Sequence, residues 1–141
     1  MFSKLLQGTF FLLIVRPVIY IWMGLSVRHR RRLPRQGPAI IVANHNSHLD
    51  TVVLMSLFPM RKLAYIRPVA AADYWMKTPL LSWFATHIIN IIPIERNTSI
   101  VRQDIFAPMN EALENGEFLI LFPEGSRGEP EQMTEFKSGI A

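Results

Sequence analysis

Residues 39–50 read AIIVANHNSHLD, and the predicted fold depends on the change of pattern within this stretch. The apolar run Ala39–Ala43 is short and continuous, which is typical of a strand in a sheet covered on both faces. A polar loop follows, and Ser47 is a favoured N-cap for a helix that begins at His48. The stretch therefore predicts a strand, a loop and a helix in that order.

The chain beyond this stretch repeats the same alternation of short apolar runs and longer segments of mixed polarity. Gly116 lies where a helix C-cap is common. The alternation favours a single α/β domain. Further strands are predicted at Leu63–Ile66, Ile88–Ile92 and Phe118–Phe122, and helices near 48–57, 74–86 and 98–114.

Three loops follow the carboxyl ends of predicted strands, where the binding sites of open α/β sheets collect. They read NHNSHLD, PIERN and PEGSRG. We therefore expect functional side chains in these loops.

The bulk composition points to a large core or to contact with lipid. Of 141 residues, 50% are apolar and only 18% are charged. The chain has no cysteine, which excludes a disulfide framework, a thiol nucleophile and a zinc-thiolate site.

The positive charge is confined to the N-terminus. Seven of the 15 basic residues and no acidic residue lie in 1–35, whereas the other eight and all 11 acidic residues lie in 36–141, which therefore carries −3. A basic segment beside apolar residues favours an anionic membrane over nucleic acid as its partner. We therefore divide the chain into a membrane-associating helical segment, 1–35, and an α/β part, 36–141.

Residues 5–27 would reach about 34 Å as one helix, enough to cross a bilayer. However, Arg16 lies near the middle, where a charge costs about 2.5–3.5 kcal/mol, and Pro17 interrupts the hydrogen-bond ladder. We therefore predict two shorter helices, hinged at Arg16 and lying in one leaflet, with the arginines of RHRRRLPR on anionic headgroups. The positive-inside tendency predicts the cytoplasmic face. A cleaved signal peptide and an ordinary buried helix pair are the alternatives.

His45 and Asp50 are the first candidate catalytic residues. On one straight helix they would lie about 140° apart, so they cannot pair in that way. If Ser47 caps the helix, Asp50 lies in its first turn and can fold back to the imidazole, orienting a general base for a hydroxyl. The alternatives are that Ser47 and Asp50 form only a capping box, and that His48 is the base.

The stretch FPEGSRG, which begins at Phe122, predicts a phosphate contact. Arg127 can donate a charge-assisted fork, and glycine lets backbone N–H groups approach an anion. Arg96 follows the predicted strand Ile88–Ile92 and is a second cation at the same edge. The alternatives are a solvated turn and a surface charge.

Together these loops resemble the glycerophospholipid acyltransferase family, particularly the lysophosphatidic acid acyltransferases. The family's first block, His-x4-Asp after Asn, is similar to residues 44–50, and it assigns the base to His45. The third block, Phe-Pro-Glu-Gly-Thr-Arg, is similar to residues 122–127, with Ser126 for Thr. The second block, Gly-x-x-Phe-Ile-x-Arg, fits only at Ile94 and Arg96, which leaves the acceptor subclass open. The resemblance continues into residues 136–141.

The resemblance implies a partly complete acyltransferase-type sheet, because the family's fourth block is absent and the match is truncated after the third. It implies transfer of a fatty acyl group from coenzyme A or acyl carrier protein to a lysophospholipid, most simply 1-acylglycerol 3-phosphate, in phospholipid biosynthesis. No metal or cofactor is expected. The implied catalytic residues are His45 and Asp50, and the implied acceptor-binding residues are Arg96, Glu124, Gly125, Ser126 and Arg127.

Two other functions stay open. One is an enzyme of the same fold with another acceptor, such as glycerol 3-phosphate, a lysophosphoethanolamine lipid or an amino-acid lipid. The other is a non-catalytic membrane-binding fragment.

Overall fold

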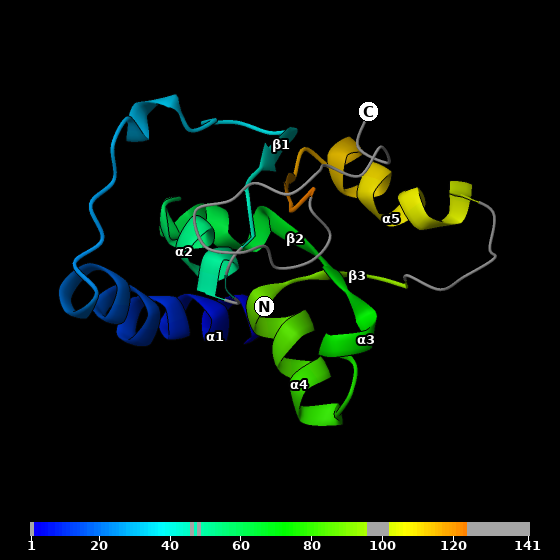
Figure 1. The fold of residues 1–141 in the computed structure, drawn as a ribbon, viewed down its shortest axis with the longest axis horizontal. Helices are drawn as coiled ribbons and strands as arrows, with labels where there is room; N and C mark the ends of the chain where they lie inside the picture. Colours follow the sequence, from blue (N-terminus) through cyan, green and yellow to red (C-terminus); the bar gives the residue numbers. More distant parts are fainter. Residues whose placement is uncertain (1, 46, 48, 96–101, 124–141) are drawn as a thin grey trace.

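The computed structural model describes residues 2–45, 47, 49–95 and 102–123 (Figure 1). Four parallel strands form one sheet in the order β1-β4-β2-β3. Neighbouring strands pair Ala39 with Phe118, Ile66 with Phe118, and Val69 with Ile92. The strands are β1 (Ala39–Val42), β2 (Ile66–Ala71), β3 (Ile92–Ile94) and β4 (Phe118–Leu121).

Helices connect the strands and precede the sheet, which confirms the predicted α/β class. The N-terminal helix comprises α1 (Phe2–Phe10), η1 (Phe11–Val15) and η2 (Pro17–Trp22), and η3 (Arg30–Arg32) is a single turn. The connecting helices are α2 (Leu49–Ser56), η4 (Met60–Tyr65), α3 (Ala72–Trp75), α4 (Pro79–Phe84), η5 (Ala85–Ile89) and α5 (Arg102–Glu114).

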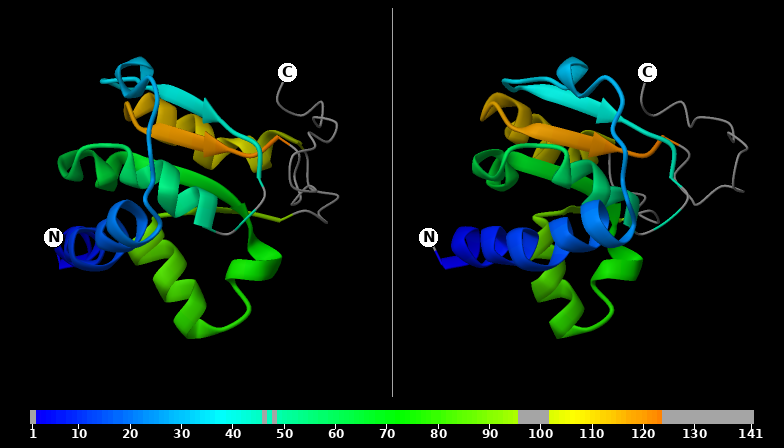
Figure 2. Two further views of the ribbon diagram at one scale, coloured as in Figure 1. Left: turned by 60° about the vertical axis from the view of Figure 1, so that its left-hand side comes forward. Right: turned by 90° about the vertical axis from the view of Figure 1, so that its left-hand side faces the viewer.

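The sheet has a helix layer on each face, as both views of Figure 2 show. Side chains of β4 alternate between the two layers, as expected for a strand buried on both sides. Phe118 and Ile120 pack in the core that includes α2 and the N-terminal helix, whereas Leu119 packs against Met109 of α5. The covered sheet therefore explains why β4 reads as a continuous apolar run.

Two of the four predicted strands begin at the wrong residue. The run Leu63–Ile66 is mostly the end of the 3-10 helix η4, from which Leu63 is buried in the core. The run Ile88–Ile92 begins with the last two residues of η5, which ends because Asn90 adopts a left-handed conformation with φ +63°, and only Ile92 belongs to β3. The Asn90 amide then donates to Ala64 O at 3.2 Å, which fastens this turn beside β2. Burial of an apolar run alone does not distinguish a strand from a helix end.

The predicted helices near 48–57 and 98–114 are confirmed as α2 and α5, but the one near 74–86 is divided. A new helix begins at Pro79, where Thr78 is the N-cap and its Oγ1 accepts from the Leu81 N–H at 3.2 Å. The predicted cap at Gly116 is confirmed: its φ is +73°, and the adjacent N–H groups bond back to α5 as in a Schellman motif.

The two predicted N-terminal helices are one continuous helix over residues 2–22, so the predicted hinge at Arg16 is wrong. The hydrogen-bonding pattern widens to π-helical turns on both sides of Arg16, which accommodates Pro17 without ending the helix. The helix is long and apolar enough to cross a membrane, and 22% of its most apolar window is buried. The division of the chain at residue 35 stays a prediction.

Candidate functional site

The loops that follow β1 and β4 leave the sheet side by side, because these two strands are neighbours in the parallel sheet. The pairing continues past β1, where the Ala43 N–H donates to Leu121 O at 3.1 Å. Directly beyond, the imidazole of His45 packs on the ring of Phe122, with 4.3 Å between the ring centroids and 33° between the planes. The first predicted loop therefore begins beside Phe122, the residue that follows β4, at the carboxyl edge of the sheet.

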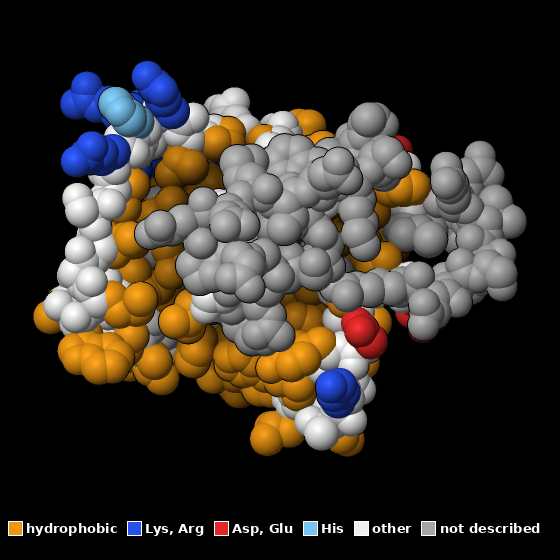
Figure 3. Space-filling view, viewed as in Figure 1, with side chains coloured by type: hydrophobic (Ala, Val, Ile, Leu, Met, Phe, Trp, Pro, Cys, Tyr) orange, Lys and Arg blue, Asp and Glu red, His pale blue; other side chains and the backbone are white. Residues whose placement is uncertain are grey.

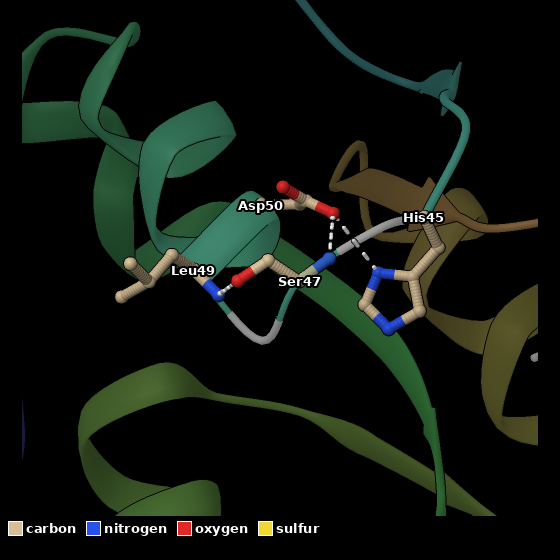
Figure 4. Close-up of polar contacts among 4 residues, drawn as sticks. All are labelled: His45, Ser47, Leu49 and Asp50. Atoms are coloured by element: carbon tan, nitrogen blue, oxygen red, sulfur yellow. Dashed lines mark hydrogen bonds and ion pairs between the residues drawn. The ribbon is translucent and has the colours of Figure 1, made fainter. Parts of the chain in front are cut away.

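His45 and Asp50 lie together, as the sequence predicted. Nδ1 of His45 is 3.4 Å from Oδ2 of Asp50 (Figure 4). The same Oδ2 accepts the backbone N–H of Ser47 at 2.7 Å. The chain between the two residues thus folds back, and the carboxylate in the first turn of α2 faces the imidazole.

The local sequence explains this turn. Ser47 Oγ accepts the Leu49 N–H at 3.2 Å, and the Asp50 N–H donates to Ser47 O at 3.0 Å. With the Asp50 carboxylate on the Ser47 N–H, these bonds form a capping box, and a negative charge here is also favoured by the helix dipole. The capping and pairing interpretations are therefore compatible, because one carboxylate oxygen makes both contacts.

The pair is accessible to a substrate. The side chains of His45 and Asp50 are 19% and 30% exposed. Nδ1 of the imidazole faces the carboxylate, and Nε2 points away from it (Figure 4). A carboxylate at Nδ1 holds the imidazole in the tautomer whose Nε2 accepts a proton, so the arrangement suits general-base chemistry on a hydroxyl.

The predicted acceptor-binding residues lie outside the described residues, and so does the competing base His48. The predicted acceptor-binding residues are Arg96, Glu124, Gly125, Ser126 and Arg127. Their strands are described, however, and β2 separates β3 from β4 in the sheet. Two strand spacings amount to about 10 Å. The segments that lead to Arg96 and Arg127 therefore start about 10 Å apart along the same edge.

Sequence reasoning missed the role of Phe122 as the aromatic neighbour of His45. Its place directly after the last strand was visible, but its partner depends on β4 lying beside β1. Within the part of the chain that the structure describes, no three His, Asp or Glu side chains are grouped as metal ligands.

Comparison with known proteins agrees with the resemblance in the loops. The family model described as Acyltransferase matches residues 24–141. The chain is 27% identical over 122 residues to the chloroplastic 1-acyl-sn-glycerol-3-phosphate acyltransferase of Arabidopsis thaliana, covering 86% of this chain and 32% of the relative. It is also 27% identical over 134 residues to the human 1-acyl-sn-glycerol-3-phosphate acyltransferase beta. That match covers 89% of this chain and 44% of the relative.

A third relative has a different acceptor in its name. The lyso-ornithine lipid O-acyltransferase of Rhizobium meliloti is 29% identical over 125 residues, covering 87% of this chain and 39% of the relative. The chain thus spans less than half the length of these curated relatives. No solved structure matches it.

Proposed function

This chain belongs to the acyltransferase family, and from that premise we propose that the whole protein moves a fatty acyl group from a thioester to the free hydroxyl of a lysophospholipid. The observation that carries the proposal is the His45–Asp50 pair beside Phe122, inside the matched region and at the edge of the sheet where the three loops leave. A paired, partly exposed imidazole is the group that such a transfer requires, because a hydroxyl is a weak nucleophile until its proton is removed.

The proposed reaction is a direct transfer. Nε2 of His45 removes the proton of the acceptor hydroxyl while the hydroxyl oxygen attacks the thioester carbonyl carbon. Asp50 stabilises the imidazolium through Nδ1–H. The carbon–sulfur bond then breaks, and the leaving thiolate takes the proton from His45. The products are the acylated phospholipid and the free thiol of coenzyme A or acyl carrier protein.

The acceptor phosphate is proposed to bind between Arg127 and Arg96, through charge-assisted hydrogen bonds. The backbone at Gly125 and Ser126 adds N–H donors. Glu124 positions Arg127 or binds the glycerol hydroxyls. The order of the strands supports this proposal, because β3 and β4 end at the same edge of the sheet, only two strand spacings or about 10 Å apart.

We propose 1-acylglycerol 3-phosphate as the acceptor, which two of the relatives carry in their names. A second candidate is a lysolipid with an amino-acid headgroup. The Rhizobium relative favours it, and so does the second block, where only Ile94 and Arg96 follow the pattern that the resemblance implies.

We further propose that the N-terminal helix lies in one leaflet on the cytoplasmic face, instead of crossing the membrane. One face of this helix is buried in the core, where Phe11, Val15 and Ile19 pack with Met55 and Phe58. A crossing helix would have to leave this core or draw the charged domain into the bilayer. The other face carries exposed apolar residues suited to lipid contact: Phe2, Leu5, Leu12, Leu13, Ile14, Ile21 and Trp22.

The test is thioester consumption by the purified full-length protein. Palmitoyl-coenzyme A and palmitoyl-acyl carrier protein would each be offered with 1-acylglycerol 3-phosphate, glycerol 3-phosphate, a lysophosphoethanolamine lipid and lyso-ornithine lipid, followed by product analysis. We expect free thiol and phosphatidic acid in equal amounts with the first acceptor. Turnover with lyso-ornithine lipid alone would replace the proposed acceptor, and thiol release without an acylated lipid would contradict acyl transfer.

A further inference from the structure

A basic hollow lies between the end of α2 and the segment that follows the N-terminal helix. Its volume is about 290 Å³, and its walls are residues 27–30, Arg32, Leu33 and Leu57. Three arginines and His29 thus contribute to the walls of one space. No acidic residue precedes Asp50 in the sequence, so the local charge is not balanced by a nearby carboxylate of this segment. Such a hollow suits an anion.

One side-chain contact and one backbone turn build this hollow. The guanidinium of Arg30 donates twice to Leu57 O, from Nε at 3.2 Å and from Nη2 at 2.8 Å, which fixes one wall to the end of α2. His29 has φ +57°, a conformation uncommon for a residue other than glycine, and it begins the single turn η3. Because of this turn, the side chains of neighbouring arginines lie on different sides: Arg30 and Arg32 line the hollow, whereas Arg31 does not.

The surroundings indicate which anion the hollow takes. Val27, Leu33 and Leu57 give it an apolar part, which suits the first methylene groups of a lipid acyl chain next to a charged headgroup. The helix that ends just before it exposes Ile21 at 82% and Trp22 at 84%. In Figure 3 the basic cluster and the lower-left apolar surface lie along the same side of the molecule. Cations next to exposed aromatic and aliphatic side chains are typical of contact with an anionic bilayer.

From these observations we infer that the hollow binds the phosphate of one anionic phospholipid, such as phosphatidylglycerol, as a site separate from the acyl acceptor's. The separation follows from α2. Asp50 is in its first turn and Leu57 follows its last residue, so about 10 Å of helix lies between them. The inference does not depend on acyl transfer. It predicts that the arginines act as a defined site and not as evenly spread charge.

The experiment is a titration of the full-length protein with dihexanoyl phosphatidylglycerol below the critical micelle concentration of the lipid. Binding is monitored through the NMR signals of the His29 ring. We expect saturable shifts. In Arg32→Gln and in Arg28→Gln we expect the affinity to fall about tenfold or more. The matched control is Arg31→Gln, which removes the same charge one residue away and should retain the affinity within about threefold.

Two further titrations complete the test. Dihexanoyl phosphatidylcholine should give no saturable shift, because its headgroup has no net charge, and inorganic phosphate at the same ionic strength should give only a weak one. Equal losses in all three arginine variants would overturn the inference in favour of diffuse charge. Saturation by inorganic phosphate at the concentration that suffices for the lipid would overturn the assignment to a lipid headgroup. A vesicle flotation assay with phosphatidylglycerol should rank the variants in the same order.

Discussion

The two ends of α2 are held by different kinds of contact. At the first turn, Asp50 contacts His45 and the backbone of Ser47, all within five residues of sequence. At the last turn and just beyond it, backbone carbonyls accept side chains from the N-terminal segment, 27 to 42 residues earlier in the chain. These donors are Tyr20 to Ser56 O, Arg30 to Leu57 O and Arg16 to Phe58 O.

The two ends of α2 therefore have different roles: the first turn carries the candidate catalytic pair, and the other end attaches the N-terminal segment. The first turn presents a partly exposed His-carboxylate pair to the edge of the sheet, whereas the carbonyls just beyond the last turn accept from two arginines, as the C-terminal end of a helix favours. Arg16 illustrates the second kind of contact. Its charge, which looked costly within an apolar segment, is directed at the Phe58 carbonyl and so fastens the N-terminal helix to the domain.

The largest effect is expected from His45→Ala, which removes the proposed base at the first turn. Acyl transfer should fall by up to about 10⁴-fold in kcat/KM, since no group remains to take the hydroxyl proton. Thioester release with the best acceptor measures it. His87→Ala is the matched control, because His87 is exposed and, among the described residues, its ring bonds within its own helix, to Trp83 and Thr86. Near-normal turnover of His45→Ala would remove this residue from the mechanism.

A smaller loss is expected from Asp50→Asn, on the order of 10²-fold in kcat. The amide oxygen can still accept the Ser47 N–H, so the helix cap is retained, but the charge that stabilises the imidazolium is lost. Comparison of turnover and melting temperature with those of Asp50→Ala, which loses both, separates the two roles. Full activity in Asp50→Asn together with a loss in Asp50→Ala would leave Asp50 a capping role only.

At the other end, Arg16→Met should destabilise the fold by about 1–3 kcal/mol, because the Phe58 carbonyl loses its donor in a part-buried position. Urea unfolding measures the free energy. Arg31→Met makes the same chemical change at an exposed residue and should stay within about 0.5 kcal/mol of the parent. If the two variants lose equal stability, the contact does not fasten the helix.

The smallest effect is expected from Ser47→Ala. Loss of the Oγ bond to the Leu49 N–H should cost about 1 kcal/mol of unfolding free energy. Turnover should stay close to that of the parent, since the Asp50 carboxylate still has the Ser47 backbone N–H. A loss of turnover comparable with that of His45→Ala would assign the serine hydroxyl a part in catalysis.

Much of the fold was predictable wherever the decisive contacts are local. The strand β1, the helix α2 and the Gly116 cap follow from patterns a few residues long, and the structure confirms them. The starts of β2 and β3 were not predictable. Leu63 and Ile88 are buried at helix ends, and an apolar run shows burial without showing which backbone conformation achieves it.

The candidate site divides in the same way. The pairing of His45 with Asp50 was predicted as one possibility, because a helix capped by Ser47 places Asp50 in its first turn, within reach of the imidazole. The proximity of His45 to Phe122 was not, because 77 positions separate them and the contact requires β4 to pair with β1 across two intervening strands of sequence. The roles of Arg96, Glu124, Gly125, Ser126 and Arg127 stay predictions, since these residues lie outside the described ones.

From the sequence follow the α/β class and the capped first turn of α2, which made a pairing of His45 with Asp50 possible, because backbone hydrogen bonds and side-chain periodicity act over a few residues. Three other features became visible in the folded chain alone. β4 lies beside β1, and one unbroken helix packs on the domain through Arg16 and Tyr20. Arg30 and Arg32 line a hollow that Arg31 does not line. These contacts depend on which distant surfaces bury apolar area together, a choice made by the whole chain.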